Sequence, residues 1–256
     1  MNVTIEPLII SAPFGNYLKF AGCTSTLGTF TLLPRGGLAY RLWRCALTLR
    51  YDRRTKSWIN RLGLPNPGLD SLPGRDLSAS IVSIHGFSGA DWELLAGRVS
   101  FLSGCLAVEM NLSCPNVADD PDFLSGAVLA ASRLAEAGVR VIVKLPPVRW
   151  MDLAIPLFYD GGVRCFHCCN TIPTPGGGLS GKPSKQYSLW AIRDSRRRFA
   201  QDVMLIGGGG ITCEDDVREY RRAGADHVAI ASALLNPFNW RKVPRLLAAA
   251  REAIPT

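Results

Sequence analysis

Short apolar runs alternate with amphipathic stretches along most of the chain. Residues 80–85 (SIVSIH) form an apolar run typical of a buried strand, and residues 89–102 then place apolar side chains at helical spacing. This order recurs six times from residue 78 onward, and two further predicted strands precede it. The predicted strands are residues 8–12, 26–32, 80–85, 106–111, 139–145, 163–170, 203–206 and 227–231. The predicted helices are residues 89–102, 121–137, 151–159, 184–199, 214–223 and 237–253.

Strands that alternate with helices predict a parallel sheet. Eight strands within 256 residues predict a single α/β domain over residues 1–256, built as a (β/α)8 TIM barrel. The first βα unit is degenerate, because residues 13–27 are rich in Gly, Thr and Ser and no convincing helix fits there. Residues 38–62 are amphipathic and basic, so we expect a helix or a long loop over one end of the barrel.

The composition is that of a globular protein, with 47% hydrophobic and 20% charged residues. No apolar run reaches the roughly 18 residues of a membrane span, and the N-terminal residues lack the features of a signal peptide. We therefore expect a cytoplasmic protein that does not engage a membrane. The eight cysteines are expected to be free thiols, most of them buried, rather than disulfides.

Metal and nucleic-acid binding are not expected. A strand at residues 163–170 would send Cys165, His167 and Cys169 to one face and Cys168 to the other, so these side chains do not converge on a metal ion. The net charge of +8 is concentrated in two short segments, which we interpret as solvated basic faces, with binding of a phosphate or an acidic partner as the alternative.

Polar side chains cluster where predicted strands end, which in such a barrel is where the active site lies. Asn111 and Cys114 follow the fourth strand, Lys144 ends the fifth, and Asn170 ends the sixth. Lys144 either extends to the surface or faces an anionic or electron-accepting cofactor. Cys114 lies in a Pro-bounded loop, where a thiol can act as a base or nucleophile if its pKa is lowered.

Two glycine-rich segments, residues 175–182 and 207–210, follow the sixth and seventh strands. A phosphate needs several backbone N–H donors at close range, and Cβ atoms would hold it away. Tight turns also use glycine. The position of residues 207–210 between a strand and a helix nevertheless predicts a phosphate site, because such barrels bind phosphate after strands seven and eight.

At these residues the chain resembles the dihydroorotate dehydrogenase family, in particular its soluble class 1 branch. The segment 111–116 (NLSCPN) matches the family's loop after strand four, and 60–68 (NRLGLPNPG) resembles the loop that carries a substrate-binding Asn. Further matches, in chain order, are 144–147 (KLPP), 170–171 (NT), 178–181 (GLSG) and 206–211 (IGGGGI). The resemblance extends from about residue 8 to residue 253.

The resemblance implies an FMN-dependent oxidoreductase of CH–CH donors that oxidises dihydroorotate to orotate in pyrimidine biosynthesis. Cys114 would be the base that removes the C5 proton while hydride leaves C6 for the flavin, and Lys144 would lie by the flavin N1–O2 edge. Substrate binding is implied for Asn60, Gly63, Leu64, Asn111, Asn116, Asn170 and Thr171. Cofactor binding is implied for Ser11, Ala12, Gly28, Lys144, Gly178, Ser180, Gly181, Gly208, Gly209, Gly210, Ala231 and Ser232. Expected partners are the small-molecule substrate and a second copy in a homodimer, with a separate electron-acceptor subunit as a further option.

One departure from the family pattern concerns charge. Gly28 stands where the family has a lysine that contacts flavin and substrate. Either turnover is slow, or a basic residue of segment 41–61, or Lys19, supplies the missing cation.

Other functions remain open at this level. One is a flavin-binding protein of low or partner-dependent activity, which Gly28 favours. Another is a dehydrogenase or reductase of a different dihydropyrimidine. A tRNA dihydrouridine synthase would suit the basic charge, but that family usually carries a further helical domain for which this sequence leaves no residues. No cysteine cluster predicts an iron–sulfur centre.

Overall fold

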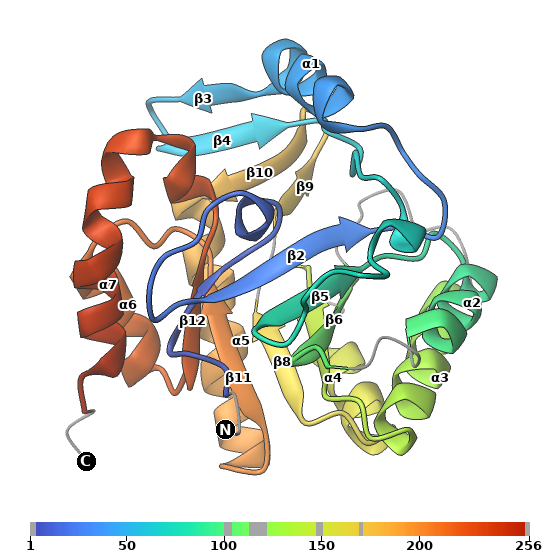
Figure 1. Cartoon of the computed structure of the whole chain (residues 1–256). Helices are drawn as coiled ribbons and strands as arrows, with labels where there is room; N and C mark the ends of the chain where they lie inside the picture. The colour runs from blue at the N-terminus through green and yellow to red at the C-terminus, as the bar shows by residue number, and fades with distance from the viewer. Residues whose placement is uncertain (1–3, 100–103, 113–121, 147–150, 169–170, 254–256) are drawn as a thin grey trace.

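A closed barrel of eight parallel strands forms the centre of the computed structural model, which describes residues 4–99, 104–112, 122–146, 151–168 and 171–253 (Figure 1). In barrel order the strands are β1 (Leu8–Ile10), β12 (His227–Ile230), β11 (Met204–Gly208), β8 (Cys165–Cys168), β7 (Val141–Leu145), β6 (Ala107–Asn111), β5 (Ser80–Ile84) and β2 (Thr24–Phe30). Each predicted strand is present, and the predicted TIM-barrel architecture is confirmed.

Helices cover the outside of the barrel (Figure 1). They are α2 (Gly89–Val99), α3 (Asp122–Glu136), α4 (Met151–Asp160), α5 (Lys185–Phe199), α6 (Glu214–Arg222) and α7 (Val243–Arg251). The helix predicted at 237–253 begins as a 3-10 helix, Pro237–Lys242, before it continues as α7. Between β1 and β2 there is only a 3-10 turn, Phe14–Asn16, so the first βα unit is degenerate as predicted.

The interior of the barrel changes from apolar to polar along the strand direction. One buried layer consists of Ile9, Ile81, Ala107, Ile142, Cys165, Ile206 and Ala229, together with Ile5 below them. Side chains two residues apart on a strand share a face. The next positions on β5, β6, β7 and β8 are therefore inward as well, and they are Ser83, Glu109, Lys144 and His167, all buried. The barrel floor is thus apolar, with a polar layer above it towards the C-terminal strand ends.

A second, antiparallel sheet and a helix lie together at one end of the barrel, the upper end in Figure 1. The sheet has the order β3 (Arg50–Asp52), β4 (Ser57–Asn60), β10 (Gly177–Gly181) and β9 (Ile172–Thr174). The helix α1 (Leu38–Thr48) precedes β3. The prediction of a helix or long loop at 38–62 was therefore incomplete, because this segment also supplies two strands.

Both glycine-rich segments differ from the prediction. Residues 175–182 are not a free loop, because β10 pairs with β4, with Gly178 opposite Asn60. The strand predicted at 203–206 continues through Gly208 as β11. Gly207 is required there by close packing, since a Cβ at this position would lie 2.4 Å from the Tyr220 ring.

Candidate functional site

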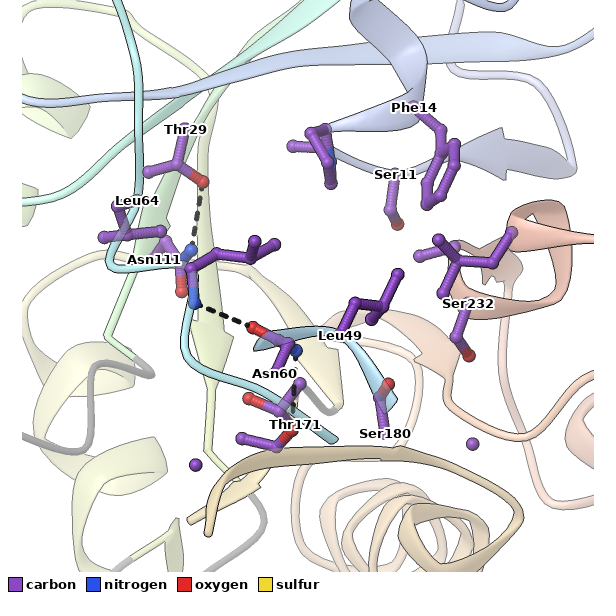
Figure 2. A pocket seen from close by; sticks show the side chains of 18 of the residues that line it. Ser11, Phe14, Thr29, Leu49, Asn60, Leu64, Asn111, Thr171, Ser180 and Ser232 are labelled. Carbon is purple, nitrogen blue, oxygen red and sulfur yellow. Dashed lines mark hydrogen bonds between the residues drawn. The ribbon is translucent and has the colours of Figure 1, made fainter. Parts of the chain in front are cut away.

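A large cavity of about 1060 Å³ is lined by the C-terminal ends of barrel strands together with residues of α1 and of the second sheet. Every predicted site residue within the described part of the chain lines this one cavity. Figure 2 labels Ser11, Asn60, Leu64, Asn111, Thr171, Ser180 and Ser232 among them. These residues are Ser11, Ala12, Gly28, Asn60, Gly63, Leu64, Asn111, Lys144, Thr171, Gly178, Ser180, Gly181, Gly208, Gly209, Gly210, Ala231 and Ser232. The predicted base Cys114 and the predicted substrate ligands Asn116 and Asn170 lie outside the described residues.

The polar layer of the barrel forms part of the cavity wall through Lys144 and His167. His167 Nδ1 lies 2.8 Å from Glu109 Oε2, and Lys144 Nζ lies 3.8 Å from Glu109 Oε1. Burial would raise the pKa of Glu109, but the Lys144 charge and hydrogen bonds from His167 and Ser83 lower it to about 2. Glu109 is therefore ionised at neutral pH. Its negative charge, on the side of the barrel interior, partly neutralises the positive charge of Lys144.

Asn111 is held from both sides at the end of β6. Its side-chain Nδ2 donates to Thr29 Oγ1 at 3.0 Å (Figure 2). Its backbone oxygen accepts from His85 Nδ1 at 2.6 Å. Thr29 Oγ1 lies 3.0 Å from Ser83 Oγ. Burial lowers the pKa of His85 to about 4, so its ring is neutral at pH 7. These contacts fix the direction of an amide that can bind a ligand carrying both donors and acceptors.

Asn60 comes from β4 of the second sheet, on the opposite side of the cavity from the barrel strands. Its Nδ2 donates to the backbone oxygen of Gly178, and its Oδ1 accepts from the backbone N–H of Leu62, both at 3.4 Å (Figure 2). Both hydrogen bonds are long, so a ligand with better geometry can replace them. The pairing of β4 with β10 is what places Asn60 and Gly178 on the same wall.

The backbone at the end of β11 forms a turn of consecutive glycines, which have no side chains. Gly209 and Gly210 both have positive φ angles, +105° and +70°, and both line the cavity together with Gly208. A Cβ at Gly209 would lie 2.5 Å from Ser184 Oγ, and one at Gly208 would lie 2.9 Å from His167 Nε2. A bare backbone turn of this kind suits an anionic group such as phosphate.

Arginines of α1 face the cavity, which differs from the prediction of a solvated basic face and agrees with the alternative that segment 41–61 brings a cation to the site. Arg41 and Arg44 both line the cavity, whereas Trp43 between them is 55% exposed and does not. Arg41 Nη1 donates to Tyr17 Oη at 2.8 Å, and Arg44 donates to the backbone oxygen of Arg61. The Nε of Arg44 is buried without a hydrogen-bond partner among the described residues. Lys19 is not part of the lining.

Gly28 could not carry the lysine that the family pattern expects. Its φ is +108°, and a Cβ would lie 2.4 Å from the backbone oxygen of Ser83. We expect Gly28→Lys to destabilise the fold by at least about 2 kcal/mol of strain, which corresponds to a melting temperature lower by roughly 4–8 °C. Thermal unfolding followed by circular dichroism measures this effect. Gly63→Lys is the matched control, because Gly63 also has a positive φ but nothing within 4 Å of its Cβ position. Equal melting temperatures for the two variants would contradict the proposed clash.

Sequence reasoning missed Glu109, His167 and Thr29 as parts of the site, and it included Arg44 only as one of several basic residues of segment 41–61. A signal for Glu109 exists in the sequence, because a charged residue at the centre of the apolar run 106–111 must face inside the barrel with a partner. His167 was considered only as a metal ligand. The described residues contain no group of three side chains that could hold a metal ion.

Comparison with known proteins gives one consistent family. A family model described as dihydroorotate dehydrogenase matches residues 163–250. "Dihydroorotate dehydrogenase B (NAD(+)), catalytic subunit" from Desulforudis audaxviator is 32% identical over 260 residues, covering 88% of this chain and 79% of that protein. The protein of the same name from Oceanobacillus iheyensis is 29% identical over 221 residues, covering 75% and 71%.

A solved structure supports the same fold. The ligand-free type DHODH from Eimeria tenella superposes with a TM-score of 0.71 over 96% of this chain and 86% of that chain. The sequence identity of that pair is 20%, so this likeness concerns the architecture.

Proposed function

Since this chain belongs to the dihydroorotate dehydrogenase family, we propose that it oxidises dihydroorotate to orotate, using FMN bound in the cavity at the barrel mouth. The observation that carries this proposal is that all seventeen described residues assigned by resemblance, from nine separate segments of the chain, line that one cavity. In pyrimidine biosynthesis this reaction forms the C5–C6 double bond of the pyrimidine ring.

The residues around the cavity fit an anionic flavin nucleotide. Gly208, Gly209 and Gly210 would hold the phosphate, because a Cβ at Gly209 would collide with Ser184 and only a bare backbone leaves room there. Lys144 would face the edge of the ring system, where negative charge increases on reduction. When bound, FMN supplies the two-electron acceptor for the hydride that leaves the substrate.

The proposed substrate is bound by amides and deprotonated by a thiolate. Asn60 and Asn111 supply both donors and acceptors to the pyrimidine ring and its carboxylate, and Asn116 and Asn170 would complete the set. Cys114 would remove the proton from C5. A thiol carries out this step once its proton is lost, which the cations of the cavity would favour.

Arg44 would supply the cation that Gly28 does not. Its Nε is a buried donor without a partner among the described residues, and its side chain lines the cavity. We expect Arg44→Ala to lower kcat/KM for dihydroorotate by roughly tenfold to a hundredfold, the usual loss for a hydrogen bond to a charged group. Steady-state kinetics measures this loss. Arg53→Ala is the control, because Arg53 is exposed on the β3–β4 hairpin and does not line the cavity. A wild-type value for Arg44→Ala would contradict the role.

The proposed function is tested by isolating the protein with FMN and adding dihydroorotate without oxygen. We expect a yellow protein with a flavin spectrum that dihydroorotate bleaches. A protein that does not bind FMN would overturn the cofactor assignment. A bound flavin that dithionite bleaches and dihydroorotate does not would favour a different dihydropyrimidine, or the low-activity flavoprotein that Gly28 suggests.

The proposal includes a cytoplasmic homodimer and leaves a separate electron-acceptor subunit as an option. Among the described residues, no helix is long and apolar enough to cross a membrane. The relatives from Desulforudis audaxviator and Oceanobacillus iheyensis are themselves named catalytic subunits. Size-exclusion chromatography with light scattering, at several concentrations, measures the oligomeric state.

A further inference from the structure

Three ionisable side chains meet in the polar layer of the barrel, on the neighbouring strands β6, β7 and β8. Lys144 pairs in register with Asn111 on one side and with His167 on the other. Lys144 and His167 line the cavity, while Glu109 is 1% exposed and not part of the lining. The positive charge at this part of the cavity wall therefore depends on how closely the Glu109 carboxylate approaches Lys144 and how closely it approaches His167.

The Glu109 carboxylate is within hydrogen-bond distance of the histidine but makes only a longer ion pair with the lysine. His167 Nδ1 lies 2.8 Å from Oε2, whereas Lys144 Nζ is 3.8 Å from Oε1. Oε1 has no hydrogen-bond partner among the described residues. A charge-assisted N–H···O bond is usually about 2.8 Å long. A shift of about 1 Å would therefore turn this long ion pair into a charge-assisted hydrogen bond.

The protonation of the histidine follows from its neighbours. An ionised carboxylate only accepts hydrogen bonds, so His167 must donate its Nδ1–H to Glu109. Burial and the Lys144 charge lower the pKa of His167, against the opposing effect of Glu109, so the ring is neutral at pH 7. The remaining nitrogen, Nε2, carries a lone pair beside Gly208 at the cavity wall.

We propose that His167 is a positioning residue that holds the Glu109 carboxylate off the Lys144 ammonium, and so sets the positive charge that Lys144 presents to a bound flavin. This inference rests on the proposed FMN site. A group that gains negative charge on reduction binds more tightly when the facing cation is less neutralised. The hydrogen-bonded pair of Glu109 and His167, called the dyad below, thus sets how much more tightly the cavity holds reduced FMN than oxidised FMN.

Two substitutions have opposite expected effects. His167→Leu removes the Nδ1–H donor, so the carboxylate turns to Lys144 and neutralises it. We expect the ratio of reduced to oxidised FMN affinity to fall about tenfold, which lowers the two-electron midpoint potential by about 30 mV. Glu109→Gln removes the negative charge and leaves Lys144 unopposed, so the potential should rise by a similar amount. Equilibrium reduction against a reference dye measures both values.

A conservative variant and a remote one control this experiment. In His167→Asn the side-chain amide can donate to Glu109 in place of Nδ1–H, so we expect a potential within about 10 mV of wild type, a change of roughly twofold in the affinity ratio. His227→Leu serves as the remote control, since His227 begins β12, bonds the backbone oxygen of Glu6 and does not line the cavity. Shifts of the same sign for His167→Leu and Glu109→Gln, or no shift for either, would overturn the proposal.

A measurement without flavin separates this inference from the proposed function. Nitrogen NMR of the three histidines, with the His167 signals assigned by their loss in His167→Asn, reports which ring nitrogen carries the proton. We expect Nδ1–H and a bare Nε2 at pH 7. A ring protonated on Nε2 would overturn the inference even if dihydroorotate bleaches the wild-type flavin. If wild-type protein does not bind FMN, the proposed function fails and the NMR result alone decides the arrangement of the dyad.

Discussion

Replacement of Cys114 with alanine is expected to slow the reduction of bound FMN by dihydroorotate by about 100-fold or more. That factor is the usual contribution of a positioned general base, and alanine has no group that can take the C5 proton. Because Cys114 lies outside the described residues, the role rests on the match of segment 111–116 to the family's loop. Stopped-flow absorbance without oxygen measures the rate directly.

The control for this prediction is a second cysteine of the same barrel. Cys165 is buried inside the barrel, and burial raises its pKa far above the ordinary value, so it stays a thiol. Cys165→Ala should therefore reduce its flavin at the wild-type rate. If Cys114→Ala also reduced at that rate, another residue would have to be the base.

Replacement of Gly209 with valine is expected to weaken FMN binding at least 100-fold, about 3 kcal/mol. Gly209 has a φ of +105°, which a β-branched residue rarely adopts, and a Cβ there would lie 2.5 Å from Ser184 Oγ. Relief of that contact would move the turn that we assign to the phosphate. Titration of FMN fluorescence with the protein gives the Kd.

Gly138→Val separates the loss of a ligand site from backbone strain alone. Gly138 also has a positive φ, +78°, but it follows α3, has nothing within 4 Å of its Cβ position and does not line the cavity. We expect this variant to lose stability and to keep its affinity for FMN. Comparable affinities for Gly209→Val and wild type would place the phosphate elsewhere.

Local sequence patterns were sufficient to predict the barrel. Most barrel strands are buried on both faces and form short, largely apolar runs, although β2 (TSTLGTF) is rich in Thr and Ser. The covering helices repeat apolar residues every three to four positions. Both signals arise within about fifteen residues of chain. The C-terminal strand ends then gather Asn111, Lys144 and the glycines of β11 at one mouth, because parallel strands all end on the same side.

Contacts between distant segments decided the rest of the site. The pairing of β4 with β10 joins residues more than a hundred positions apart, and it turned a predicted loop into a strand that carries one wall of the cavity. The inward direction of Arg44 depends on the backbone oxygen of Arg61, which no helical periodicity encodes.

By itself, the sequence determined the barrel, the end at which the site lies and the family, because each depends on local periodicity or on short contiguous motifs. Only the tertiary structure decided that Glu109 lies between His167 and Lys144, and that a side chain at position 28 has no room. It also decided that the glycines of 207–210 have two different roles, close packing and a backbone turn. In that run Gly207 packs beneath Tyr220, whereas Gly209 forms a turn. These properties depend on which atoms of other strands lie within a few ångströms, and that information exists only after the chain has folded.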